Sequence, residues 1–263
     1  QLIMEKCKCP VCKSGKLFKS VRKNVFGLIK VEEFICNKCN ATFVKKADKY
    51  KLSKVLDKSN KVWQEYGNQT LTEREWKNIA NGGMSDEKQK ERDMLFWLNN
   101  LREGKVNIEI EGEAPILLKK NEKLKMVIPN ISLLEPRRVV TGGYGGPSFR
   151  VTKGVYFRLG SFRAQSHEEL KNIDRGIFTL TDKRIVFSGA KRNVNIDLRK
   201  IASVEPYKDG IVIRRNDREK PQYFTGIDKV KLTIEIKNRK YIEPLSGLIL
   251  MYLIEGLVGK NES

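Results

Sequence analysis

The stretch CKCPVCKSG, residues 7–15, places three of the five cysteines of the chain within six residues. The other two cysteines stand in CNKCN, residues 36–40. The pattern is therefore C-x-x-C, a spacer of twenty-three residues and a second C-x-x-C, with Cys7 left over. Thiols at this spacing are either disulfide partners or metal ligands, and the redox compartment of the protein decides between the two.

The sequence favours a compartment in which cysteines stay reduced. The first residues do not resemble a secretion signal, because the residues that follow them are charged and polar rather than a continuous apolar run. The longest apolar segment, residues 245–259, contains Glu255 and is shorter than the roughly 18 to 20 residues that span a bilayer. We therefore expect a soluble, cytoplasmic protein.

In such a compartment the two C-x-x-C turns predict a structural Zn²⁺ site with four thiolate ligands, Cys9, Cys12, Cys36 and Cys39. Two β-rich runs lie between the turns and predict a hairpin, so that residues 7–45 resemble a zinc ribbon. Four thiolates fill a tetrahedral shell and leave no position for an activated water, so the zinc is expected to be structural. Unligated buried thiols, redox chemistry and an exchange of Cys7 for Cys9 are the alternatives.

Residues 49–104 lose the β pattern and carry helix signals. Thr72 and Glu75 form a capping box at the start of one helix. A second helix is expected to begin after Ser85 and to bury the apolar residues that recur at helical spacing, Met94, Trp97, Leu98 and Leu101. A helix-turn-helix reader of DNA is an alternative, but the second helix mixes charges of both signs. We therefore expect a helical connector.

From Lys105 onward, short runs of alternating apolar residues predict an antiparallel sheet or small barrel. GIFTLTDKRIVFSG, residues 176–189, is expected to be a hairpin that turns at residues 181–183. IASVEPYKDGIVIRR, residues 201–215, is expected to be a second hairpin that turns at residues 208–210. Further strands are expected at residues 106–112, 123–128, 148–160, 193–198 and 230–236.

The first of these hairpins has the order G-x-x-x-x-T-x-x-R-x-x-F, from Gly176 to Phe187, and further strand pairs and a closing apolar run follow it. This order resembles the GRAM and bacterial pleckstrin-homology-like domains over about residues 130–258. The resemblance implies a strongly bent, seven-stranded antiparallel sheet capped at one end by a C-terminal helix, residues 245–259. Eukaryotic members often bind phosphoinositides or proteins, whereas bacterial members have no single ligand, so the fold by itself does not give the function.

The sequence thus predicts an α+β multidomain protein in three parts. Residues 1–48 form the zinc ribbon, residues 49–104 the helical connector, and residues 105–263 a β domain similar to PH and GRAM domains that ends in a helix.

The charge of the chain predicts a polyanionic partner. The formal net charge is +20, and the first fifty residues hold 12 Lys or Arg against 4 acids. Nucleic acid, an anionic membrane surface and an acidic protein are the candidate partners, and a solubility bias in a Lys-rich proteome is the alternative. The candidate contacts are Lys16, Lys19, Arg22 and Lys23 on the ribbon, and Lys183, Arg184, Lys191, Arg192, Arg214 and Arg215 on the β domain. Three ribbon aromatics interleave with these cations in a composition that can stack bases, although hairpin packing explains most of them: Phe18, Phe26 and Phe34.

No catalytic constellation is found in the sequence. The glycine-rich TGGYGGPS, residues 141–148, lacks the Gly-Lys-Ser or Gly-Lys-Thr of a P-loop. His167 is the only histidine, so an acid–base triad cannot be built around it, and no small-molecule substrate is evident. We expect a non-enzymatic, zinc-binding adaptor that docks on a polyanion, with nucleic acid favoured. The alternative is binding to anionic lipid through the β domain, with the ribbon as a protein-interaction module.

Overall fold

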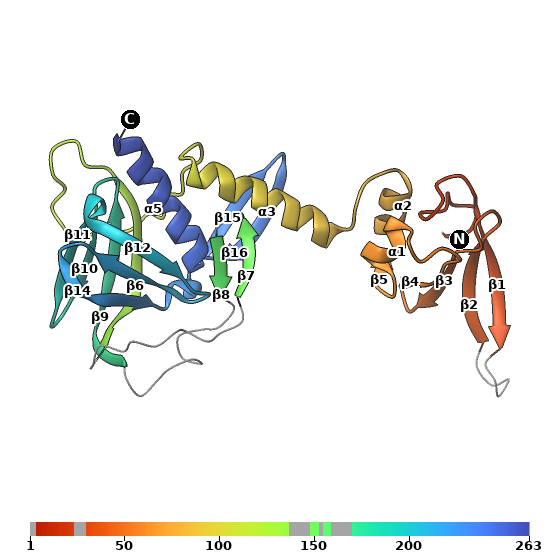
Figure 1. The fold of residues 1–263 in the computed structure, drawn as a ribbon, viewed down its shortest axis with the longest axis horizontal. Helices are drawn as coiled ribbons and strands as arrows, with labels where there is room; N and C mark the ends of the chain where they lie inside the picture. Colours follow the sequence, from red (N-terminus) through yellow and green to blue (C-terminus); the bar gives the residue numbers. More distant parts are fainter. Residues whose placement is uncertain (1–3, 24–29, 137–147, 153–154, 159–169, 263) are drawn as a thin grey trace. The chain divides into compact units, whose positions relative to one another are not determined.

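The computed structural model describes residues 4–23, 30–136, 148–152, 155–158 and 170–262. The chain divides into two compact units, Gln1–Arg92 and Asp93–Ser263 (Figure 1). None of the helices in the described part of the chain is long and apolar enough to cross a membrane.

The first unit contains a five-stranded sheet in which every strand pairs antiparallel with the next in the sequence. Its strands are β1 (Leu17–Lys23), β2 (Lys30–Cys36), β3 (Thr42–Lys46), β4 (Lys49–Lys54) and β5 (Thr70–Thr72). The hairpin expected between the two C-x-x-C turns is present as β1 and β2, which pair along their whole length. The turn between them lies outside the described residues.

Helices α1 (Lys61–Tyr66) and α2 (Glu73–Ala80) share one core with this sheet. Trp76 of α2 is fully buried, and its indole N–H donates a hydrogen bond of 2.8 Å to the carbonyl of Tyr50 in β4. Its ring also packs edge-on against Phe43 of β3, with 4.9 Å between the ring centroids. The capping box predicted at Thr72 and Glu75 is present at the start of α2. One large aromatic residue thus ties α2 to two strands of the sheet.

The structure divides residues 49–104 differently from the helical connector expected there. Strands β4 and β5 complete the first sheet, because Tyr50 and Leu52 are buried between lysines that face solvent. Helix α3 (Asp86–Arg102) runs across the boundary between the units. Its buried apolar residues, Trp97, Leu98 and Leu101, belong to the second core, and Met94 packs partly buried against that core. Helices α2 and α3 therefore do not share the common core that a helix-turn-helix needs.

The second unit is built on a seven-stranded antiparallel sheet with the order β11-β10-β9-β6-β14-β13-β12 (Figure 1). The strands are β6 (Leu124–Pro136), β9 (Leu170–Thr181), β10 (Arg184–Gly189), β11 (Asn193–Asp197), β12 (Ile201–Pro206), β13 (Gly210–Arg215) and β14 (Arg218–Thr225). Both predicted hairpins are present, as β9 with β10 and as β12 with β13. Short 3-10 helices follow β11 and β14, η1 (Leu198–Lys200) and η2 (Ile227–Lys229).

Strand β6 joins the two halves of this sheet, since it pairs with β9 on one side and with β14 on the other. Its pairing with β9 shifts register at three places, and Asn130 has a positive φ of 60° at one of them. Irregularities of this kind bend a strand and increase its twist. A long strand can therefore serve both halves of a curved sheet.

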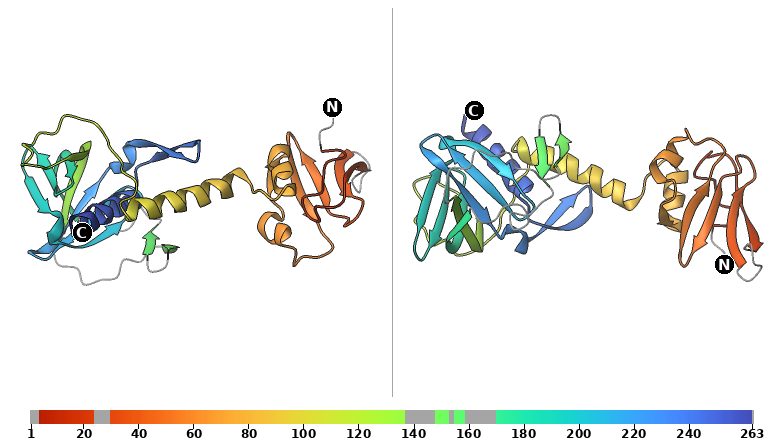
Figure 2. Two further views of the ribbon diagram at one scale, coloured as in Figure 1. Left: turned by 90° about the horizontal axis from the view of Figure 1, so that it is seen from above. Right: turned by 60° about the horizontal axis from the view of Figure 1, so that its bottom comes forward.

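Helix α5 (Gly247–Glu262) is the closing helix that the apolar run predicts, and it packs against the sheet over the core of the second unit (Figure 2). Leu250 and Tyr252 are fully buried in that core. A side chain at Gly256 would collide with the carbonyl oxygen of Leu101, so only glycine lets α5 approach the end of α3 this closely. The seven-stranded sheet followed by this helix is the arrangement that the PH and GRAM resemblance implies.

Two hairpins of the second unit stand apart from its main sheet. They are β7 (Ser148–Thr152) with β8 (Val155–Arg158), and β15 (Lys231–Ile236) with β16 (Arg239–Pro244). Asp93 connects β16 to α3, because its buried carboxylate accepts hydrogen bonds from Tyr241 at 2.7 Å and from Arg239 at 3.1 Å. The strand expected over residues 106–112 is reduced to an isolated bridge between Ile110 and Met126.

Candidate metal centre and basic residues

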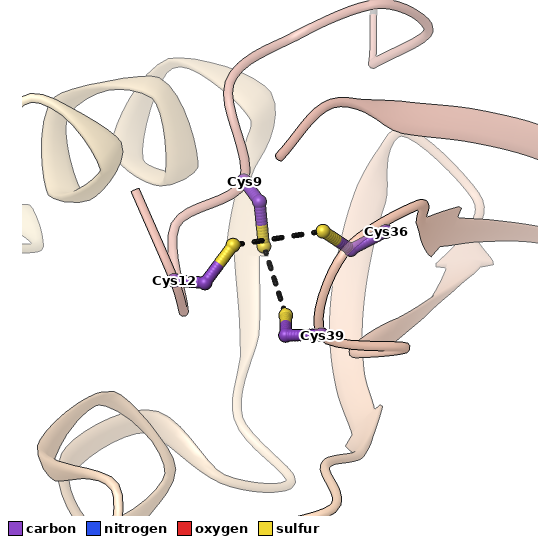
Figure 3. A group of neighbouring side chains, drawn as sticks. All are labelled: Cys9, Cys12, Cys36 and Cys39. Carbon is purple, nitrogen blue, oxygen red and sulfur yellow. Dashed lines mark hydrogen bonds between the residues drawn. The ribbon is translucent and has the colours of Figure 1, made fainter. Parts of the chain in front are cut away.

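The four thiols of the two C-x-x-C turns lie together, and their sulfur atoms are all within 4.8 Å of one another (Figure 3). Cys9 and Cys39 are 3.7 Å apart between sulfurs, and so are Cys12 and Cys36. A tetrahedral Zn²⁺ with bonds of about 2.3 Å to sulfur places its ligands about 3.8 Å apart. The separations therefore fit one shared ion, and they are far longer than the bond of about 2 Å in a disulfide.

Backbone groups orient two of these sulfurs. The N–H of Gly15 donates to the sulfur of Cys12 at 3.3 Å, and the N–H of Lys38 donates to the sulfur of Cys36 at 3.4 Å. A side chain on Gly15 would collide with the sulfur of Cys36, so this position requires glycine. Donors of this kind stabilise the thiolate form that a metal ligand needs.

The pKa values of the thiols show how strongly burial opposes the ionisation that metal binding requires. Burial opposes the ionisation of Cys12, but hydrogen bonds from Ser14 and Gly15 outweigh it and lower the pKa of this thiol to about 6. Burial raises the pKa of Cys39 to about 11 and also raises that of Cys9. Zn²⁺ binds the deprotonated thiolate, so its charge would offset the cost of holding four thiolates close together.

The thiol cluster is part of the first core. Cys9 and Cys36 are fully buried and pack in one cluster with Leu17, Phe34 and Phe43, while Cys12 and Cys39 are half-buried at its edge. Cys7 lies outside the group of four sulfurs, as expected from the spacing. The donor set, four cysteine sulfurs within 4.8 Å of one another, is one that structural zinc sites use.

The ribbon cations lie mainly on β1, and acids of the neighbouring strand β2 pair with two of them. Lys19 contacts Glu32 at 2.6 Å, and Arg22 contacts Glu33 at 3.2 Å. Lys16 is exposed beside β1, and Lys23 ends that strand. Among the three aromatics, Phe34 is a core residue, Phe18 keeps 44% of its surface exposed, and Phe26 lies outside the described residues. The combination expected to stack bases is thus reduced to Phe18 in the described part of the ribbon.

Arg184, expected to contact a polyanion, forms an ion pair within the second unit. Its guanidinium contacts the fully buried carboxylate of Glu122 at 2.7 Å and also donates to the carbonyl of Leu117. Burial opposes the ionisation of Glu122, but hydrogen bonds from Arg184, the Lys119 N–H and Thr181 outweigh it and lower its pKa to about 2. The adjacent Lys183 donates to the carbonyl of Lys120 and has no acid partner among the described residues.

Acids also neutralise Arg214 and Arg215. Arg214 contacts Glu205 at 3.4 Å, and Arg215 contacts Asp217 at 2.8 Å. Hydrogen bonds from Arg215 and Lys200 hold the pKa of Asp217 well below its usual range. The structure therefore gives these two arginines intramolecular roles.

Lys191 and Arg192 differ from the other paired cations. They lie on the turn between β10 and β11, and their side chains are exposed without an ion pair to any described acid. Asp174 holds this turn, because its carboxylate accepts the N–H groups of Lys191 at 2.6 Å and Arg192 at 2.8 Å. These hydrogen bonds, that from Lys191 first, lower the pKa of Asp174. Sequence reasoning missed Asp174 and Glu122, because their partners are distant along the chain.

Two sequence features lie outside the described residues. They are residues 141–147 of the glycine-rich stretch and His167. The last residue of that stretch, Ser148, begins β7.

The chain has a weak likeness to a protein of known structure. No protein-family model matches the chain, and no curated protein matches it. Among solved structures, the chain is similar to the Vps36 N-terminal PH domain with a TM-score of 0.32 and 12% sequence identity, over 60% of this chain and 96% of that chain.

Proposed function

We propose that this protein is a non-enzymatic adaptor whose first unit is stabilised by zinc and whose second unit docks on an anionic membrane surface. The observation that carries the docking is the exposed pair Lys191 and Arg192, held on a turn by Asp174 at one edge of the seven-stranded sheet. A turn fixed by its backbone presents both cations together, so less conformational freedom is lost on binding. Each basic residue near an anionic membrane contributes about 1 kcal/mol.

Zinc has a structural role in this proposal. Cys9, Cys12, Cys36 and Cys39 would hold the ion, and it would supply folding free energy to the first unit, because the four sulfurs form part of that core. All four ligand positions would be taken by thiolates, which leaves none for a substrate. The chemistry of the site is therefore that of a structural cross-link.

Sedimentation with vesicles tests the docking. The full chain is expected to bind vesicles of phosphatidylcholine with phosphatidylserine, and not phosphatidylcholine alone. Removing both cations in Lys191→Ala/Arg192→Ala should weaken binding by about 2 kcal/mol, or roughly 30-fold. Lys46→Ala/Lys49→Ala is a matched control, since these exposed lysines lie in the first unit and the change in net charge is the same. Equal losses in both variants, or no binding, would contradict the proposal.

Nucleic acid is the second candidate partner, and the first unit is where it would bind. The observation in its favour is Phe18, 44% exposed on β1 and close in sequence to Lys16 and Lys19. Binding of RNA or DNA by the full chain should weaken linearly in log salt, and Lys16→Glu should reduce that slope. Retention of the slope in this variant would remove the ribbon from consideration.

A further inference from the structure

A second basic site lies in the second unit, at the other end of β10 from the turn that carries Lys191 and Arg192. It is a half-open pocket of about 420 Å³ between the segment before β6, the β9–β10 turn and the end of β11. Among the residues that the structure describes, its lining consists of Lys119, Lys183, Arg184, Asn195, Asp197 and Arg199. A volume of this size suits a small organic ligand rather than a lone ion.

The wall of the pocket is fixed before any ligand arrives. The buried carboxylate of Glu122 accepts the N–H of Lys119 at 2.6 Å, the hydroxyl of Thr181 at 2.8 Å and the guanidinium of Arg184 at 2.7 Å. The ammonium of Lys183 donates to the carbonyl of Lys120 at 3.0 Å. The segment before β6 is thus fastened to the β9–β10 turn, so the cations on both sides keep their separation.

The charges of the pocket do not cancel. Arg184 is neutralised by Glu122, and Arg199 is neutralised by Asp197 at 2.8 Å. Lys119 and Lys183 have no acid partner among the residues that the structure describes. An excess of two positive charges therefore faces the space, and the amide of Asn195 offers a neutral hydrogen-bond donor beside them.

We propose that this pocket binds the phosphate group of a phosphomonoester, either a soluble metabolite or a lipid headgroup. A phosphomonoester carries close to two negative charges at neutral pH and three acceptor oxygens, which matches two ammonium groups with guanidinium and amide donors around them. The inference goes beyond the proposed docking, because it uses a different end of the sheet and a different set of residues.

Phosphorus NMR titration of the full chain with glycerol phosphate tests the soluble ligand, and flotation with phosphatidylcholine vesicles containing phosphatidic acid tests the lipid. Lys119→Ala/Lys183→Ala should weaken binding by about tenfold or more, since hydrogen bonds to charged groups are lost. The thermal unfolding temperature should fall only slightly, because the variant loses the hydrogen bond from Lys183 to the carbonyl of Lys120 but keeps the contacts of Glu122. Lys191→Ala/Arg192→Ala is the matched control and should leave glycerol phosphate binding intact.

The outcomes separate the sources of the ligand and the two proposals. Binding of glycerol phosphate that depends on Lys119 and Lys183 supports a soluble ligand. Binding of phosphatidic acid vesicles alone, if Lys119→Ala/Lys183→Ala weakens it, supports a headgroup. If the chain binds neither glycerol phosphate nor phosphatidic acid vesicles at about 10 mM ligand, the pocket proposal is overturned. A dissociation constant above that concentration corresponds to less than about 3 kcal/mol of binding free energy. Equal losses in the two double variants would overturn it as well, because general charge attraction would then explain the binding. Neither result would affect the vesicle test of the Lys191 and Arg192 turn with phosphatidylserine.

Discussion

The buried ion pair between Glu122 and Arg184 gives the sharpest prediction for stability. Glu122→Gln keeps the size of the side chain but removes its charge, leaving the Arg184 guanidinium, 12% exposed, without a carboxylate. A pKa lowered from 4.5 to about 2 corresponds to about 3 kcal/mol of preference for the charged form in the folded state. Removing one partner of a buried pair costs about 3–5 kcal/mol in other proteins. We expect a loss of about 3 kcal/mol in the free energy of unfolding.

Urea unfolding of the full chain, followed by circular dichroism, measures this loss. We expect one unfolding transition for each unit. A metal chelator should shift the transition of the first unit, so the other transition reports on Glu122. Glu111→Gln is the control, because it makes the same chemical change at an exposed position and should fall within about 0.5 kcal/mol of the unaltered chain. Replacing both partners, as Glu122→Met/Arg184→Met, should restore most of the loss, since no charge is left buried.

The pH dependence of the same variant is a second measure. The pKa of Glu122 is depressed in the folded state. The contribution of this residue to the free energy of unfolding is therefore complete above its ordinary pKa of 4.5, and it is lost as the pH falls towards about 2. The difference between Glu122→Gln and the unaltered chain should therefore shrink in acid. A cost below about 1 kcal/mol at neutral pH would show that solvent screens this pair, and the fixed wall of the phosphate pocket would lose its basis.

Two further predictions concern the metal and the boundary between the units. Elemental analysis should return one zinc per chain. Cys36→Ser should lose zinc and unfold the whole first unit, because Trp76 and the thiols share one core. Cys7→Ser should keep its zinc, and loss of zinc in this variant would show that the ligand set is wrong. A fragment of residues 93–263 should fold with a cooperative thermal transition, whereas residues 105–263 should be less stable by several kcal/mol, since they lack the buried Trp97 and Leu101. Equal stability of the two fragments would contradict the role of α3 in the second core.

Features set by neighbours along the chain could be predicted from the sequence. The two C-x-x-C turns bring four thiols together because each turn is local, and only one hairpin has to close between them. The β9–β10 hairpin was predicted for the same reason, since its turn residues and its alternation lie within residues 176–189. The capping box at Thr72 is also a pattern over four residues.

Features set by distant partners could not be predicted. In strand β4 only Tyr50 and Leu52 are apolar residues at alternate positions, and the lysines around them are typical of an exposed segment. The place of this strand in the sheet depends on its contact with Trp76. Arg184 forms its ion pair with Glu122, 62 residues away, so the adjacent basic residues in the sequence did not reveal this contact. The positions of Lys191 and Arg192 near strand ends correctly indicated exposed side chains. The sequence did not indicate that a distant acid, Asp174, fixes their turn.

Helix α3 is continuous, but its burial changes at Asp93. Before this residue the helix is half-buried or exposed, and after it Trp97, Leu98 and Leu101 are buried in the second core. Amide hydrogen exchange depends on the free energy of the local opening that exposes each N–H to water. The N–H groups near Leu98 and Leu101 exchange only when the second core opens, whereas those of residues 90–92 exchange through fraying of the exposed half. Within this one helix, the free energy of opening that amide exchange measures therefore differs between successive turns by about the free energy of unfolding of the second unit.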